Sequence, residues 1–164
     1  GALPAAGSTV GAVRPPLRVR AGAWYRADPA VRDLAWRLKR PDPAALRTVA
    51  DVLVRAIDRP GLLVPVPDRW GDPSPNAALC QAIAQRTGLV VAPLLTRSHA
   101  VASSRESRLA GRGSVPPESQ AIVLCAGRDA ILARYRTVWL VDNVVVTGTT
   151  LRAAAQALGH GLNV

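Results

Sequence analysis

Apolar and polar positions along the chain form blocks that predict helices and strands in turn. Apolar residues recur at helical spacing over 43–57, and an earlier helix is expected to start at Asp28 and stop at Pro41. Further helices are expected at 76–87, 128–135 and 151–158, and short apolar runs predict strands at 62–66, 89–95, 121–125 and 137–141. Because strands that alternate with helices are typical of βαβ units, the sequence predicts an α/β fold with a mostly parallel sheet flanked by helices.

The length of 164 residues suits one domain. Residues 1–22 are rich in Gly, Ala and Pro and are expected to form a loosely ordered N-terminal segment, with a single domain over 23–164. The printed sequence reaches Val164 just where a further strand would start, so the final strand of the sheet is expected to be missing.

Three loops are expected to meet at one edge of this sheet, namely 67–75, 96–117 and 142–150. In parallel sheets, ligands bind outside the carboxyl ends of the strands. The loop at 96–117 is polar and rich in Ser, Gly and Arg. A loop of this length is unusual in a compact domain unless it works on a ligand.

The charge balance favours an anionic partner. The formal net charge is +10, and Lys39 is the one lysine among 21 basic residues. Arginine forms bidentate contacts with phosphates and carboxylates, so small phosphates or nucleic acid are candidate partners. The alternative is a compositional bias toward Arg, with solvated guanidinium groups.

Composition and motifs exclude several classes of function. Cys80 and Cys125 lie in apolar contexts without metal-ligand spacing, which favours two buried reduced thiols over a disulfide or a zinc site. No signal peptide is evident and no apolar run approaches about 18 residues, so no membrane span and a cytoplasmic location are predicted. The chain lacks GxxxxGK[ST], GxGxxG after a strand, and GxSxG, which argues against P-loop, dinucleotide-binding and serine-hydrolase chemistry.

The most informative stretch is VWLVDNVVVTGTTL at 138–151, where an apolar strand ends on Asp142 and Asn143. Backbone N–H groups in such a turn, together with the dipole of the following helix, form a phosphate site. Asp142 would then accept hydrogen bonds from sugar hydroxyls. The alternative is that Asp142 and Asn143 are simply polar residues at the end of a strand, with Thr149 or Thr150 capping the helix. The turn itself consists of Val146, Thr147, Gly148, Thr149 and Thr150.

These residues resemble a known motif. VWLVDNVVVTGTTL is similar to the 5-phosphoribosyl-1-pyrophosphate (PRPP) motif of type I phosphoribosyltransferases, which has a hydrophobic run, two acids, small residues and T-G-x-T. The VPVP segment, loop and helix of the late-competence ComF group resemble LLVPVPDRWGDPSPNAALCQAIAQRTG in this chain. The N-terminal helix pair of that group resembles AWYRADPAVRDLAWRLKRPDPAALRTVADVL, in which Lys39 matches the lysine of the pair. SSRESRLAGRGSV looks like its basic Ser-Arg loop. The likeness covers roughly residues 24–158 and implies a type I phosphoribosyltransferase-like fold.

The resemblance implies a role for each loop. The 5-phosphate would bind the turn at Val146, Thr147, Gly148, Thr149 and Thr150, and the ribose hydroxyls would bind the catalytic pair Asp142 and Asn143. Pyrophosphate, with which magnesium (Mg2+) arrives, would bind Val66, Pro67, Asp68 and Arg69. The mobile loop would supply Arg97, His99, Arg105, Arg108 and Arg112. The implied reaction is displacement of pyrophosphate at the anomeric carbon by a nitrogen nucleophile.

The chain departs from the family pattern. Asn143 replaces the second acid, Val146-Thr147 replaces two threonines, and the cysteine-rich zinc module and the last strand are missing. Loss of one charge beside a carbocation-like centre is expected to cost about 2–4 kcal/mol of transition-state stabilisation. Ligand binding could survive, because an amide still donates and accepts hydrogen bonds.

Some side chains keep two interpretations. His99 is either a phosphate contact or a solvated loop residue, and Arg105 with Arg108 either grips pyrophosphate or forms an exposed charge cluster. Trp70 is either a packing residue or one that stacks a base or gates entry.

Three functions are therefore in competition. The first is a ComF-like protein that binds PRPP or another ribose-phosphate and serves DNA uptake during natural transformation. The second is an adaptor with weak or no catalysis that binds single-stranded DNA or a helicase. The third is a nucleobase-salvage phosphoribosyltransferase, which needs a base-recognising hood that neither 1–25 nor 96–135 shows. Turnover, the nucleophile and the oligomeric state are left open.

Overall fold

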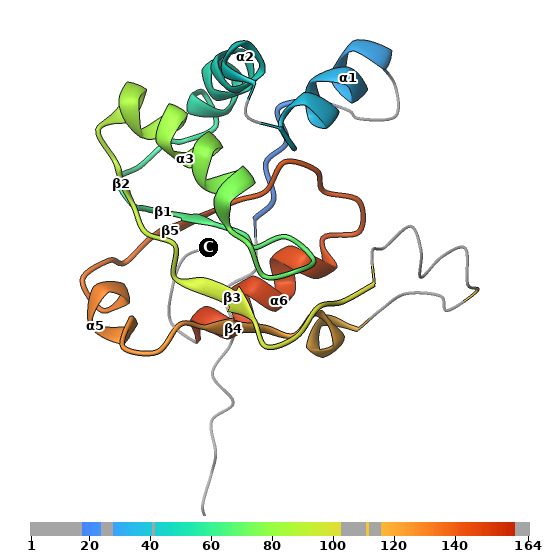
Figure 1. Ribbon diagram of the computed structural model, residues 1–164. Helices are drawn as coiled ribbons and strands as arrows, with labels where there is room; N and C mark the ends of the chain where they lie inside the picture. Colours follow the sequence, from blue (N-terminus) through green and yellow to red (C-terminus); the bar gives the residue numbers. More distant parts are fainter. Residues whose placement is uncertain (1–17, 24–27, 41, 103–110, 112–115, 160–164) are drawn as a thin grey trace, which may run out of the picture.

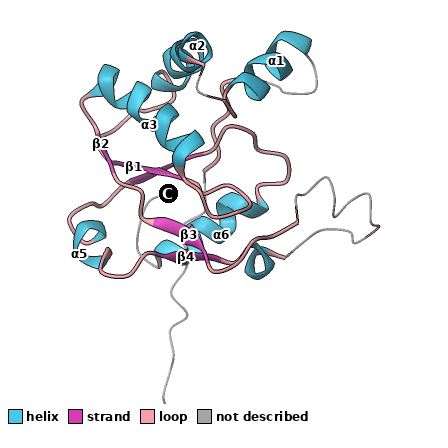
Figure 2. Ribbon diagram, viewed as in Figure 1, coloured by secondary structure: helices cyan, strands magenta, loops and turns pink. Residues whose placement is uncertain are grey.

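The structure is a computed structural model that describes residues 18–23, 28–40, 42–102, 111 and 116–159. Its centre is a parallel sheet of three strands in the order β2-β1-β5, formed by β1 (Leu62–Pro65), β2 (Val90–Val91) and β5 (Val138–Val141). A separate antiparallel ribbon pairs β3 (Leu95–Arg97) with β4 (Ile122–Leu124) (Figure 2). The predicted α/β class and parallel central sheet are confirmed, and the antiparallel ribbon is an addition to them.

Helices cover both faces of the sheet (Figure 1). On one face α3 (Ser74–Thr87) contacts β1 and β5, and α2 (Pro43–Val54) packs on α3, with α1 (Pro29–Arg37) beyond it. On the other face α6 (Thr149–Leu158) contacts β5, the β3–β4 ribbon and the 3-10 helix η1 (Pro117–Gln120). The short helix α5 (Asp129–Leu132) precedes β5.

Local sequence signals explain where the helices begin and end. Asp28 and Asp42 are N-caps, each followed by a proline at the first helical position, and Asp42 Oδ1 accepts from the backbone N–H groups of Ala44 (3.0 Å) and Ala45 (2.9 Å). Gly88 ends α3 in the left-handed conformation, with φ +73. Asp72 Oδ1 accepts from Ser74 N at 2.8 Å, so α3 starts two residues before the expected Asn76.

Alternation along the strands divides the core between the two faces. Leu62 and Val64 of β1 face the layer of α6, where they join Leu151 and Ala154. Leu63, between them, faces the layer of α3. Because both faces are covered, these strands read as continuous apolar runs rather than as alternating ones.

One predicted strand is wrong. The run 89–95 forms two strands in two different sheets, because Pro93 has no N–H to offer to a ladder. Ala92 N still donates to Leu63 O of the parallel sheet (3.0 Å), whereas the carbonyl of Leu94 accepts from Cys125 N of the ribbon (2.8 Å). The expected helix at 128–135 shortens to α5 for lack of a longer apolar repeat.

The cysteines and the helices bear on two further expectations. Cys80 and Cys125 are both free; burial raises the pKa of the Cys80 thiol to about 12, whereas Cys125 is partly exposed, so only one of the two thiols is buried as expected. No helix within the described ranges combines the length and hydrophobicity needed to cross a membrane. Most of the 1–22 segment, the final residues 160–164 and Arg105, Arg108 and Arg112 lie outside the described residues.

Candidate functional site

The loops after β1 and β5 start side by side at the carboxyl edge of the sheet. The two strands are parallel with Pro65 opposite Val141, and Val66 N donates to Val141 O at 3.0 Å. Asp142 therefore follows β5 next to the first residues of the loop after β1. This register brings together two of the three loops that the sequence assigned to one site.

Asn76, on the first turn of α3, joins the two loops. Its Nδ2 donates to Val66 O at 2.8 Å and to Asp142 Oδ1 at 3.2 Å, and the residue is only 6% exposed. Its role in the site was missed at the sequence level. The available signal was a polar residue on a helix face that is otherwise buried, together with Leu79, Cys80 and Ile83.

The carboxyl group of Asp142 is unusually basic. Burial raises its pKa from 3.8 to about 6, although donation from Asn76, from the backbone N–H groups of Asn143 and Val144, and the charge of Arg97 all act in the opposite direction. The residue as a whole keeps some exposed surface, so it is the carboxyl group that is desolvated. At neutral pH the group is mostly ionised and accepts from these donors.

The turn after Asp142 encloses a small hollow of about 40 Å³, lined by Asp142 and residues 144–151. Gly148 has φ +73, a conformation that L side chains rarely adopt. Thr149 and Thr150 lie inside α6, and the N-cap position of this helix is held by Gly148, which has no side chain to make a capping bond. The alternative in which one of these two threonines is the N-cap is therefore wrong.

The hydroxyls and one arginine of this turn are arranged around Gly148. Thr147 Oγ1 lies 2.9 Å from Thr149 Oγ1 and accepts weakly from Thr149 N at 3.4 Å. Arg152, one turn into α6, donates to Thr147 O at 2.7 Å, and its guanidinium would lie 3.9 Å from a Cβ placed on Gly148. Arg152 was not among the predicted site residues, and it adds positive charge where a phosphate would sit.

The loop after β1 has a different character. Asp68 Oδ1 accepts from Trp70 N (2.8 Å) and from Asp72 N (2.9 Å), so this carboxylate shapes its own loop. Val66 and Pro67 are buried. The carbonyl of Arg69 accepts from Val101 N at 3.0 Å, and its guanidinium carbon lies 4.0 Å from the centre of the Trp70 ring.

Arg97 was predicted to lie in the mobile loop, and this placement is wrong, because it is the last residue of β3. Its side chain is partly buried; Nε donates to Asp68 O at 2.6 Å and a terminal nitrogen donates to the carbonyl of Gln120. Burial lowers its pKa, while the charges of Asp142 and Asp68 act to raise it. Arg97 is thus a fixed cation that braces the loop after β1.

Gln120 extends this bracing to the turn at 146–150. The residue is buried, and its Oε1 accepts from Thr150 Oγ1 at 3.4 Å. Arg97 and Gln120 therefore connect the loop after β1 with the start of α6. His99 is exposed and its ring contacts only the neighbouring Ser98 hydroxyl among the bonds seen in the described part of the chain.

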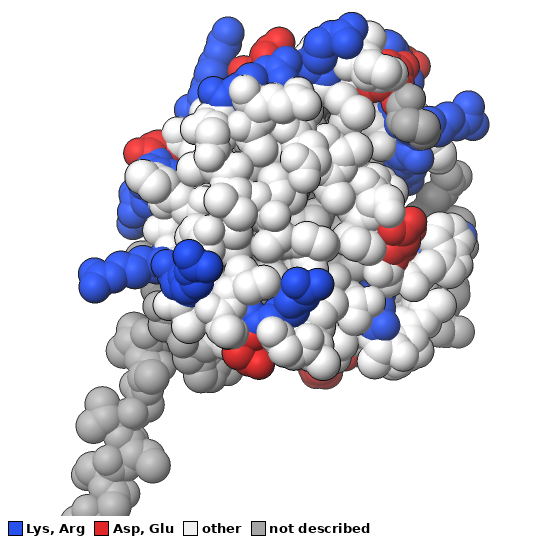
Figure 3. Space-filling model, turned by 60° about the vertical axis from the view of Figure 1, so that its left-hand side comes forward, with Lys and Arg blue, Asp and Glu red and all other residues white. Residues whose placement is uncertain are grey.

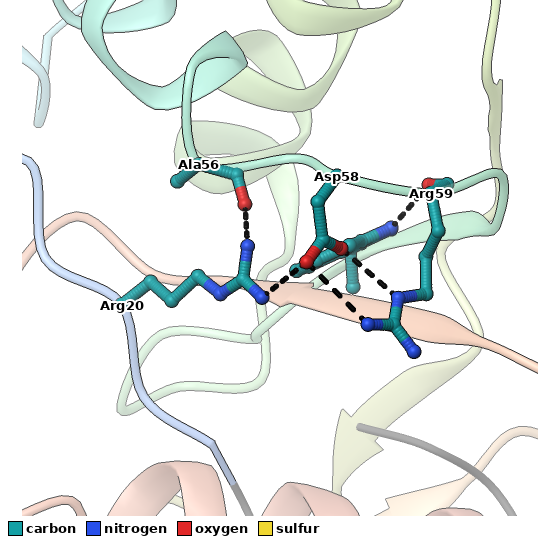
Figure 4. A network of polar contacts seen from close by, with 5 residues as sticks. Arg20, Ala56, Asp58 and Arg59 are labelled. Atoms are coloured by element: carbon teal, nitrogen blue, oxygen red, sulfur yellow. Dashed lines mark hydrogen bonds and ion pairs between the residues drawn. The ribbon is translucent and has the colours of Figure 1, made fainter.

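A second and larger cavity, of about 90 Å³, lies along β5 on the side away from β1. Residues 139–142 line it together with apolar side chains of α2 and α3 and with the segment 18–20. Arg20 holds that segment in place, donating to Ala56 O and to Asp58 (2.6 Å) and lying 5.3 Å from the Trp139 ring centre (Figure 4). Its lining is mostly apolar, with Arg18, Arg20 and Asp142 as the charged residues.

No protein-family model matches the chain, and no curated protein or solved structure is significantly similar to it. Within the residues described, no three His, Cys, Asp or Glu side chains cluster in a way that could hold a metal ion.

Proposed function

We propose that this chain is a ComF-like protein with a type I phosphoribosyltransferase-like fold that binds PRPP or another ribose-phosphate and acts in DNA uptake during natural transformation. The observation that carries the proposal is the turn at 146–150. It combines a left-handed glycine, Gly148, at the N-cap of α6 with threonine hydroxyls and a nearby carboxylate at Asp142. Backbone donors beside a carboxylate suit a phosphate joined to a sugar.

Each part of the ligand has a matching group. The 5-phosphate accepts from the backbone N–H groups and hydroxyls of the turn, with Arg152 beside it. Asp142 accepts from the ribose hydroxyls. Pyrophosphate lies toward the loop after β1, where Arg97 provides a fixed positive charge. Magnesium belongs to the substrate, because Asp142 is the single acid in the turn and is already engaged by Asn76.

The chemistry that this arrangement supports is displacement at the anomeric carbon. Pyrophosphate leaves with the bonding electrons, a nitrogen nucleophile forms the new bond, and the nitrogen loses a proton. Asp142 is the one formal negative charge in the 142–150 turn that could stabilise a carbocation-like centre, because the neighbouring position is Asn143. We therefore expect binding to be better preserved than turnover.

The proposal is tested by thermal unfolding with magnesium-PRPP, ribose 5-phosphate and pyrophosphate. A ligand at 100 times its Kd should raise the Tm by about 5–10 °C. The test variant is Gly148→Ala, and Gly88→Ala is its matched control, since both glycines have φ +73 and neither has a crowded Cβ position. Each substitution should cost about 1–2 kcal/mol in the free protein.

Only Gly148→Ala should lose the ligand-induced shift. The absence of a shift with millimolar ligand in folded wild-type protein would contradict the proposal. An equal loss in both variants would show that backbone strain, rather than the turn itself, governs the response.

A second candidate function is an adaptor that binds single-stranded DNA or a helicase and has lost catalysis. Asn143 and the net charge of +10 favour it. Figure 3 shows Lys and Arg mainly around the margin of one face, about a large neutral area, so on that face they do not form one continuous basic track. The charge distribution therefore supports DNA binding by an adaptor less strongly than the turn at 146–150 supports ribose-phosphate binding.

The two candidates are separated by Asn143→Asp. If the protein is a weakened enzyme, this variant should raise PRPP turnover by about 10²–10³-fold without changing affinity for a single-stranded oligonucleotide. An adaptor should show no turnover in either form and a Kd for the oligonucleotide that weakens steeply with salt. Unchanged turnover and DNA binding that does not respond to salt would remove support from both.

A further inference from the structure

Trp70 is the most exposed of the large hydrophobic side chains in the described residues, at 65%. It lies in the loop between β1 and α3, at the carboxyl edge of the sheet. An exposed indole at that edge contributes little to the core. It offers a flat apolar surface where ligands of parallel sheets bind.

The loop holds this ring on a rigid base. Asp68 Oδ1 accepts from Trp70 N, and Asp68 N donates to Asp72 O at 2.8 Å, which closes the loop on itself. Gly71, with φ +91, packs so closely on β3 that an added Cβ would lie 3.2 Å from the backbone nitrogen of Arg97 and from the Thr96 hydroxyl. Because this backbone is already ordered, a ligand that stacks on the ring pays little further conformational entropy.

Arg69 stacks its guanidinium group on the indole ring of Trp70. Its guanidinium carbon lies 4.0 Å from the ring centre, so the cation covers one face of the indole. The residue remains 65% exposed, so much of the side chain is still open to solvent. A flat heteroaromatic ring bound there would complete a stack of guanidinium, indole and ligand, and such stacking does not depend on base identity.

Polar contacts connect this loop with the proposed phosphate site. Arg97 Nε donates to Asp68 O at 2.6 Å, Arg97 also contacts Gln120, and Gln120 Oε1 accepts from Thr150 Oγ1 at 3.4 Å. The stacking surface and the phosphate turn are thus held in one frame by Arg97 and Gln120.

We propose that Trp70 is the stacking platform for the heteroaromatic base of a nucleotide whose ribose 5-phosphate occupies the turn at 146–150. The inference rests on the proposed function for the position of the phosphate, and it adds the residue that would recognise the base. It implies that affinity for a nucleoside 5-phosphate exceeds affinity for ribose 5-phosphate, with little discrimination between bases.

The test measures Kd by isothermal titration calorimetry for adenosine 5-monophosphate, cytidine 5-monophosphate and ribose 5-phosphate. The variants are Trp70→Ala and Trp70→Phe. Trp36→Ala is the matched control, because Trp36 is also exposed (57%) and carries a cation, Lys39 Nζ, 4.6 Å from its ring centre, but lies on α1. Melting temperatures confirm that each variant is folded.

We expect Trp70→Ala to lower the affinity for both nucleotides by about 5- to 150-fold and to leave the affinity for ribose 5-phosphate almost unchanged. Trp70→Phe should restore most of the affinity, and Trp36→Ala should bind as the wild type does. Equal nucleotide affinity in wild type and Trp70→Ala, or an equal loss in Trp36→Ala, overturns the stacking role.

The two proposals fail in different ways. If ribose 5-phosphate binds and the nucleotides bind no tighter, the platform is wrong and the ribose-phosphate site stands. If the nucleotides bind through Trp70 while ribose 5-phosphate does not bind and Gly148→Ala has no effect, the platform stands and the phosphate site is wrong. If no compound binds, both are overturned.

Discussion

The turn after β5 and the loop after β1 start as neighbours on parallel strands, yet their polar groups have different surroundings. In the loop after β1, Asp68 and Asp72 accept from backbone N–H groups of their own segment. In the turn after β5, Asp142 also accepts from the N–H groups of Asn143 and Val144, but the N-cap residue Gly148 has no side chain, and Asp142 and residues 144–151 surround a hollow. Bonds within the segment hold the first loop in shape, whereas the second also leaves room beside the start of α6.

This difference shows that polar residues at a sheet edge do not all serve as ligand contacts. A carboxylate that satisfies nearby N–H groups is a scaffold, and removing it costs stability first. A buried carboxylate such as Asp142 costs stability in the free protein, because desolvation opposes its charge. Four tests can break or sharpen the comparison.

The largest effect is expected from Gly71→Ala compared with Gly148→Ala. Both glycines have positive φ, but a Cβ at Gly71 would lie 3.2 Å from atoms of β3, whereas at Gly148 the nearest atoms are 3.9 Å away in a flexible arginine. Gly71→Ala should therefore destabilise the protein by about 2–4 kcal/mol and Gly148→Ala by about 1–2 kcal/mol. Urea unfolding measures both, and equal costs would contradict the rigid packing of the loop after β1.

The next effect concerns pH and Asp142. Its pKa is raised from 3.8 to about 6, so the folded protein retains a proton that the unfolded chain releases between about pH 4 and 6. Its contribution to the free energy of unfolding should fall by about 2–3 kcal/mol as pH rises through this window and then stay constant. The free energy of unfolding of Asp142→Asn should therefore rise relative to that of the wild type by that amount from pH 4 to pH 7.5.

Urea unfolding at several pH values measures this difference, in which all other titrating groups cancel. Asp72→Asn is the control, for which the free-energy difference should change with pH in the opposite direction. Hydrogen bonds from Ser74 lower the pKa of Asp72, so the stability that its ionised carboxylate contributes is lost as pH falls. A pH-independent difference for Asp142→Asn would show that its carboxyl group is solvated.

A smaller loss is expected from Asn76→Leu. The substitution has similar volume but removes the side-chain donor to the buried carbonyl of Val66 and one of the donors to Asp142, whose carboxyl group keeps the N–H groups of Asn143 and Val144. We expect a cost of about 1–3 kcal/mol and a further rise in the pKa of Asp142. Carbon-detected NMR of the carboxyl group reads the pKa, and an unchanged value would mean that Asn76 does not hold the carboxylate.

The smallest effect separates two variants of Asp68. Asp68→Asn keeps an oxygen that can accept from Trp70 N and Asp72 N, whereas Asp68→Ala removes it. Asp68→Ala should lose about 1 kcal/mol and Asp68→Asn less, with little change in affinity for pyrophosphate in the latter. If Asp68→Asn lost pyrophosphate binding at unchanged stability, its carboxylate would be a ligand contact after all.

The local signals in the sequence were sufficient for most of the elements. Asp28, Asp42 and Gly88 mark helix ends through capping chemistry that involves only near neighbours. The break between β2 and β3 also had a local signal in Pro93, because proline cannot donate to a strand ladder. The apolar residues on both sides of Pro93 nevertheless favoured one continuous strand. The prediction of a single strand over 89–95 is wrong because an apolar run does not report whether each residue can donate to a ladder.

The partners of the site residues had no such local sign. Asn76 lies 66 positions before Asp142, and Arg97 lies 23 before Gln120. A pattern of spacing within one element cannot report which loops the sheet register brings together. The placement of Arg97 in a mobile loop was wrong for this reason, since β3 exists only through its pairing with β4.

The sequence by itself determined the alternation of helices and strands and the Gly-centred turn after β5, because propensity, capping and glycine's freedom act over a few residues. Only the tertiary structure decided that the antiparallel ribbon separates from the parallel sheet, that Asp142 is desolvated, and that Asp68 serves its own loop while the turn at 146–150 stays open. Burial and partner choice depend on packing between distant segments, and these terms set the pKa of Asp142 and the availability of each donor.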